Sequence, residues 1–113
     1  MRSKTPLIAS GYLLLVCGSL HARQKPTIEV ASASYGLNSS NRALGNATEY
    51  VKSACDAKRS CIVAVKCAAN AIADPAPGKS KNFDFVYRCG DRVKEGHIEG
   101  DSTNKSVLLT CAD

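Results

Sequence analysis

Two segments alternate between apolar and polar residues, which predicts strands that pack on one face. The segment 83–89, FDFVYRC, is the clearer one, because its aromatic residues fall at every second position. The segment 27–35, TIEVASASY, follows a proline and places Ile28 and Val30 on one face, with Ala33 on the other. Both segments are therefore expected to be strands with one buried side.

Two shorter segments are apolar and rich in β-branched residues. They are 61–65, CIVAV, and 106–111, SVLLTC, and each carries a cysteine at one end. Runs of this length and composition are typical of buried strands. The sequence thus predicts four strands in all.

The segment 46–58 carries the clearest helix signal. Asn46 is suited to the N-cap, Glu49 stands three residues later, and the apolar residues follow at helical spacing. Cys55 then falls on the inward side of the last turn.

Three polar segments separate these elements. Residues 36–45 and 90–105 are rich in turn-forming residues, and the long stretch 66–82 contains Pro75, Pro77 and a glycine that oppose regular structure. No repeat or linker divides the chain. The expected fold is a small single α+β domain, with an antiparallel sheet, one main helix and a long structured loop.

The N-terminus has the pattern of a secretory signal peptide. Arg2 and Lys4 precede an apolar stretch that is too short to cross a bilayer. Cleavage after Ser19 or after Ala22 remains open, and lipidation at Cys17 is disfavoured by the bulky residue before it. Residues 1–22 are therefore assigned to the signal and 23–113 to the domain, which predicts a secreted or periplasmic protein without a transmembrane segment.

Removal of residues 1–22 also changes the charge of the chain. The formal charge of +5 falls to +3, because the signal carries two basic residues and no acidic one. A solvated basic face explains the remaining cluster better than a nucleic-acid groove does, since few aromatic residues accompany it. The cluster consists of Lys79, Lys81, Arg88, Arg92 and Lys94. Nucleic acid is therefore not expected as a partner.

A domain of about 90 residues is expected to need covalent cross-links for its stability. After residue 22 the cysteines are Cys55, Cys61, Cys67, Cys89 and Cys111. In an oxidising compartment they are expected to form disulfides. Five is an odd number, so one thiol is free, one bridges two chains, or Cys17 is retained. No CxxC pair is present, so a metal site is not expected.

Little in the sequence indicates an enzyme. His97 is the one histidine certain to remain after signal removal, and its neighbours form no nucleophile or ligand motif. Asp74 and Asp84 are a conceivable glycosidase pair, but their spacing does not bring them together. We expect neither catalytic residues nor a cofactor.

The loop 66–82 has the chemistry that a neutral sugar requires. Carboxylate, ammonium and amide groups together match hydroxyls that both donate and accept hydrogen bonds. The loop supplies these groups from Asn70, Asp74, Lys79, Lys81 and Asn82. Tyr35, at the end of the first strand, is placed to offer an aromatic face to the C–H side of a sugar. Capping and solvation of a surface loop explain the same residues equally well.

Several motifs occur together in an order that resembles a known family. They are YG at 35–36, GNAT at 45–48, CDAKRSC at 55–61, DPAPGKSKNF at 74–83 and VYRC at 86–89. This order resembles the sea-urchin-egg-lectin (SUEL) type domain of the rhamnose- and galactose-binding lectins, in the diverged form of bacterial exported proteins. The resemblance covers about residues 28–111.

The resemblance implies a sugar site and a disulfide. Asp74 and Lys81 match the family's hydrogen-bonding pair, Tyr35 matches the tyrosine of its YGR motif, and Asn70 falls near its loop asparagine. It also implies a bridge from Cys55 to Cys89. The expected function is therefore recognition of a monosaccharide or glycan end, such as rhamnose or galactose.

Two departures from the family pattern favour a rival function. Leu37 stands where the family has arginine, and Ala76 replaces the cysteine of its DPC motif. The rival is a secreted protein-binding module, an inhibitor or an adhesion accessory, on a lectin scaffold that has lost its sugar.

Overall fold

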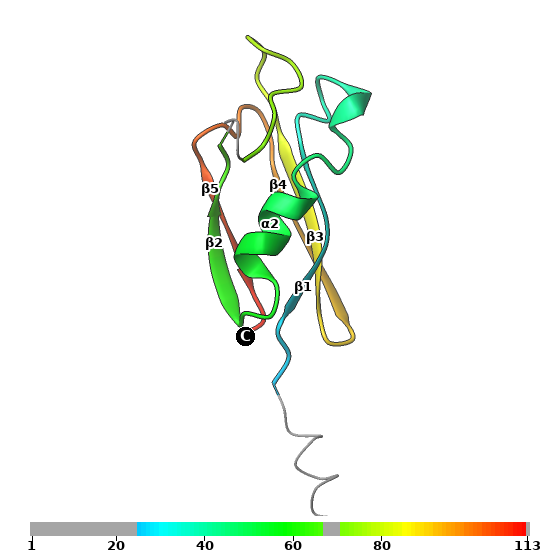
Figure 1. Cartoon of the computed structure of the whole chain (residues 1–113), viewed down its shortest axis with the longest axis vertical. Helices are drawn as coiled ribbons and strands as arrows, with labels where there is room; N and C mark the ends of the chain where they lie inside the picture. Colours follow the sequence, from blue (N-terminus) through cyan, green and yellow to red (C-terminus); the bar gives the residue numbers. More distant parts are fainter. Residues whose placement is uncertain (1–24, 67–70, 113) are drawn as a thin grey trace, which may run out of the picture.

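The computed structural model describes residues 25–66 and 71–112, so the expected signal peptide lies outside the described residues. The described chain forms five strands, one α-helix and one short 3₁₀ helix (Figure 1). In chain order these are β1 (Ile28–Tyr35), η1 (Asn41–Ala43), α2 (Thr48–Cys55), β2 (Ser60–Ala64), β3 (Phe83–Cys89), β4 (Arg92–Ile98) and β5 (Ser106–Thr110). The expected small α+β fold is confirmed, and sheet dominates it.

The strands form two antiparallel sheets that share one core. One sheet has the order β1-β3-β4, and the other pairs β2 with β5. Apolar side chains of both sheets and of α2 belong to a single buried cluster that includes Val30, Val51, Val63, Phe83 and Leu109. Figure 1 shows α2 between β2 and β1, where it joins the two sheets.

β4 is a strand that the sequence did not reveal. Its segment, RVKEGHI, was expected to be part of a polar turn region, yet all seven residues pair with β3. Its side chains are exposed or half-buried throughout, and its sequence does not alternate clearly between apolar and polar residues. Packing explains the glycine at position 96, because a Cβ on Gly96 would lie 2.2 Å from an atom of the Phe85 ring.

A β-bulge changes which residues of β1 face the core. The register with β3 shifts between Val30 and Ser32. Beyond the bulge, Ala33 and Tyr35 are buried although simple alternation placed Ala33 on the outer side. The bulge therefore turns the end of β1, and with it Tyr35, into the interior.

The free edge of β1 is covered by polar side chains from α2 and its flanks. Asn46 accepts from the Tyr35 N–H at 2.7 Å and donates to the Tyr35 carbonyl at 2.9 Å. Thr48, Lys52 and Asp56 bond the backbone of Ala33 and Val30 in the same way. Asn46 is consequently not the N-cap that the sequence suggested, because its amide is committed to β1.

Two disulfides link neighbouring elements, and they differ from the expected one. Cys55 bonds Cys61, and Cys89 bonds Cys111. The Cys55–Cys89 bridge that the family resemblance implied is therefore wrong, because the turn after α2 brings the start of β2 back to Cys55. Cys67 lies outside the described residues.

The loop lengths predict unequal contributions of the two disulfides to stability. The bonded cysteines are 22 residues apart in one bridge and 6 apart in the other. Chain entropy then gives about 3 kcal/mol for Cys89–Cys111 and about 2 kcal/mol for Cys55–Cys61. We expect a Cys89→Ser/Cys111→Ser variant to lose more free energy of unfolding in urea than Cys55→Ser/Cys61→Ser. Equal losses, or non-reducing peptide maps with other pairings, would contradict this.

Candidate functional site

Three segments, 36–47, 71–82 and 99–105, lie at one end of the described domain, here called the loop end. Figure 1 shows them at the end away from the β3–β4 turn. Asn38 and Asn82 join two of the segments, since each side-chain oxygen accepts from the backbone N–H of the other residue at 3.2 and 3.0 Å. This exchange continues the β1–β3 ladder past its last residues and fixes where the loops leave the sheet.

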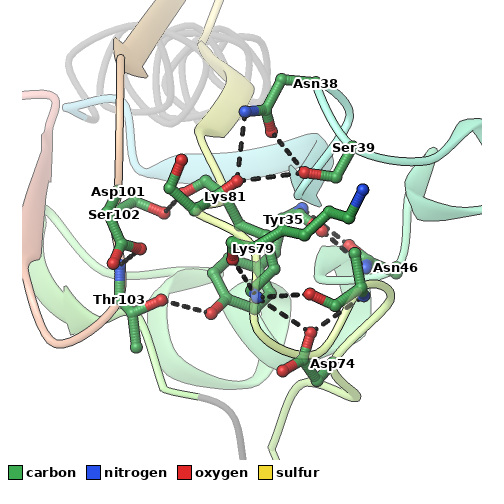
Figure 2. A network of polar contacts seen from close by, with 12 residues as sticks. Tyr35, Asn38, Ser39, Asn46, Asp74, Lys79, Lys81, Asp101, Ser102 and Thr103 are labelled. Carbon is green, nitrogen blue, oxygen red and sulfur yellow. Dashed lines mark hydrogen bonds and ion pairs between the residues drawn. The ribbon is translucent and has the colours of Figure 1, made fainter.

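A buried ammonium group lies at the centre of the loop end. Lys81 is only 4% exposed, and its Nζ donates to the carbonyls of Ala76 and Lys79 at 2.9 and 2.5 Å. Asp74 completes the set with its Oδ1 at 3.1 Å from the same Nζ (Figure 2). An ammonium has three N–H donors, so these contacts use its full capacity. Lys81 thereby closes residues 74–81 into a compact loop.

Asp74 and Tyr35 both contact this ammonium. Asp74 Oδ1 also accepts from the Ala76 N–H at 2.9 Å, and the Asp74 side chain keeps 26% of its surface exposed. The Tyr35 ring lies 5.9 Å from Lys81 Nζ, within the range of a cation–π contact. Tyr35 itself is fully buried, and its hydroxyl bonds Thr103 at 2.5 Å.

The third segment of the loop end is joined to the same network. Ser102 is fully buried, and both its N–H and its hydroxyl donate to the Lys81 carbonyl, at 2.7 and 2.6 Å. Next to it, hydrogen bonds from Thr103 hold the pKa of Asp101 below its ordinary value. Nothing in the sequence pattern singled out Ser102 or Thr103, because isolated hydroxyl residues in a polar loop are common.

Three of the four expected sugar-binding residues thus come together. Tyr35, Asp74 and Lys81 meet at the loop end, while Asn70 lies outside the described residues. Their expected roles need correction. Tyr35 offers no exposed face because the bulge buries it, and Lys81 has no N–H left for a ligand. Asp74 is the one member of the three with appreciable exposed surface.

Other polar clusters lie away from this network. His97 bonds Asp84 on the outer face of the β3–β4 pair at 2.5 Å, and Asp84 also accepts from Asn82. No group of three metal-ligating side chains occurs in the parts of the chain that the structure describes. A broad open depression lies between residues 25–29, 56–57 and 89–92, and none of the expected site residues lines it.

Comparison with known proteins adds no relative: no family model, curated protein or solved structure matches this chain. Within the described residues, no helix is long and apolar enough to cross a membrane. The site must therefore be interpreted from its own geometry.

Loss of the Lys81 ammonium should loosen the loop end. A Lys81→Met variant keeps the length of the side chain but removes the donor of two carbonyls and the charged Lys81 partner of the Asp74 carboxylate. We expect a loss of about 3 kcal/mol in the free energy of unfolding, measured in urea. Lys79→Met is the matched control, because the Lys79 side chain is exposed. Equal stability of the two variants would show that the network contributes little.

Proposed function

We propose that this protein is an exported, lectin-like domain that binds a monosaccharide or glycan end, such as rhamnose or galactose, at the loop end. The observation that carries the proposal is the Asp74–Lys81 ion pair above the Tyr35 ring. These positions are up to 46 residues apart in the sequence. The family resemblance assigns all three to the sugar site, and Lys81 contacts both Asp74 and the Tyr35 ring.

In this proposal Asp74 contacts the sugar and the other two residues position it. A carboxylate that binds a neutral sugar must be held in place, since each freely rotating side chain loses entropy on binding. Lys81 holds Asp74 by charge, and the Ala76 N–H holds the same oxygen. Lys79 and Ser80 are exposed polar residues of the same loop and can supply donors and acceptors for further hydroxyls.

Export is supported by independent features. The N-terminal 22 residues have the composition of a signal peptide, and the described domain contains two disulfides. Disulfides of this kind persist in oxidising compartments outside the cytosol. A secreted or periplasmic location fits both features.

One observation favours the rival function, a protein-binding module on a scaffold that has lost its sugar. The aromatic face of Tyr35 is buried and the Lys81 ammonium is saturated, so two of the three groups assigned to sugar contact are occupied within the protein. A protein that binds the exposed surface of the loop end would require neither the Tyr35 ring nor the Lys81 ammonium to move.

Calorimetric titration of rhamnose, galactose and glucose distinguishes the two functions. We expect one of these sugars to bind wild-type protein, and Asp74→Asn to weaken that binding about ten- to a hundredfold. The reason is that an ionised acceptor makes hydrogen bonds worth about 1.5 to 3 kcal/mol.

The control is Asp91→Asn, the same chemical change in the turn at the opposite end of the domain, which should leave affinity unchanged. Because Asp74 also pairs with Lys81, the unfolding free energy of each variant is measured in parallel. Absence of heat with all three sugars at millimolar concentration, together with a blank glycan array, would refute the sugar-binding proposal in favour of the rival.

A further inference from the structure

Four sheet edges exist in the described domain, and on three of them at least one backbone group bonds a side chain from another element. The edge of β1 is covered by side chains from α2 and its flanks. Tyr50 donates its hydroxyl to the Ala64 carbonyl of β2 at 2.8 Å. On β5, Tyr87 and Lys94 bond the backbone of Thr110.

The fourth edge, on β4, is different. Among the described residues, no hydrogen bond joins the backbone of Val93 or of residues 95–98 to any element other than β3. An exposed edge of this kind is a template for an added strand, because its N–H and C=O groups are already spaced for a ladder. Val93, a residue that is 60% exposed, adds apolar surface beside it.

We infer that two copies of this chain associate through β4, antiparallel to each other, to form a continuous six-stranded sheet. A two-fold axis perpendicular to the sheet keeps the core-facing side of both copies on one side. With that symmetry each residue of one β4 strand lies opposite a residue of the other β4 strand whose side chain points to the same face of the sheet. Three registers then keep most of β4 paired, centred on Lys94, Glu95 or Gly96.

Charge selects one of these registers. A centre at Lys94 or at Glu95 places two like charges directly opposite each other, which is destabilising. A centre at Gly96 places the two glycines on the axis and Glu95 opposite the second copy's His97, once on each side. Lys94 then lies opposite Ile98, whose apolar surface can cover the lysine stem. Since His97 Nδ1 also bonds Asp84, a protonated His97 would lie between two carboxylates in this register.

The symmetry has a consequence for the loop end. β3 runs away from the loop end and β4 returns to it. Since the two β4 strands are antiparallel, the two loop ends lie at opposite ends of the six-stranded sheet. A dimer of this form presents its two loop ends in opposite directions. It is suited to bridging two ligand-bearing surfaces, and it is not suited to binding one surface through both loop ends. The β4 pairing itself does not depend on the proposed sugar site.

Sedimentation equilibrium on the purified, oxidised protein tests the inference. At pH 5, where a histidine ordinarily carries a positive charge, wild type should show a concentration-dependent monomer–dimer equilibrium. Glu95→Lys should weaken it about tenfold, because like charges then lie opposite each other on both sides of the axis. Glu29→Lys is the control. It makes the same charge change at an exposed position of β1, on the same outer face but at the covered edge.

Hydrogen exchange locates the contact. Amides within residues 95–97 should exchange more slowly as the concentration rises, and amides of β1 should not change. A strict monomer at millimolar concentration would overturn the inference. So would a dimer that Glu95→Lys leaves intact and in which the β4 amides show no added protection, since such a dimer uses another surface.

Discussion

The demand of backbone N–H and C=O groups for hydrogen-bond partners governs this domain. In two small sheets within about 90 residues, a large share of the strands are edge strands. An unpaired buried backbone group costs about as much free energy as a lost hydrogen bond. The chain meets this demand with side chains. Asn46, Thr48, Lys52 and Asp56 cover β1, and this requirement fixes α2 alongside that strand.

The loop end follows the same rule. Residues 74–81 form no ladder, so their carbonyls need donors from elsewhere, and the Lys81 ammonium supplies two of them. Burial of that charge is tolerable because Asp74 lies beside it and the Tyr35 ring lies below. The Ala76 carbonyl is thus held by a contact to the Lys81 ammonium. Electrostatic contacts close this loop, whose residues 74–81 include no cysteine.

Much of the fold could be predicted from local pattern, and the exceptions have physical causes. β1, β3 and β5 were predicted within one residue because one side of each is buried. β4 was missed because it is an edge strand with one solvent-facing side and a central glycine, so its sequence does not alternate clearly between apolar and polar residues. The bulge in β1 and the role of Asn46 arise from tertiary contacts, which a sequence window does not contain.

Disulfide pairing was beyond prediction for a related reason. Cys55 and Cys61 are joined because the chain reverses between α2 and β2, where Ala57 adopts a positive φ of 70°. A non-glycine residue in that conformation is uncommon and leaves no trace in composition. The resemblance led to the wrong partner for both Cys55 and Cys89. Three of the residues that it assigned to a sugar site, Tyr35, Asp74 and Lys81, meet at the loop end.

The burial of Lys81 also limits how any ligand can use the loop end. Each of its three donors is bound within the protein, so a ligand contact would require one of these bonds to break, at a cost comparable to the bond gained. A ligand that meets Asp74, by contrast, adds to an anion that is already oriented and keeps its ion pair. Binding at the loop end would therefore cost least where the network stays closed, and in the proposed sugar site Lys81 would act on the ligand through the position it gives to Asp74.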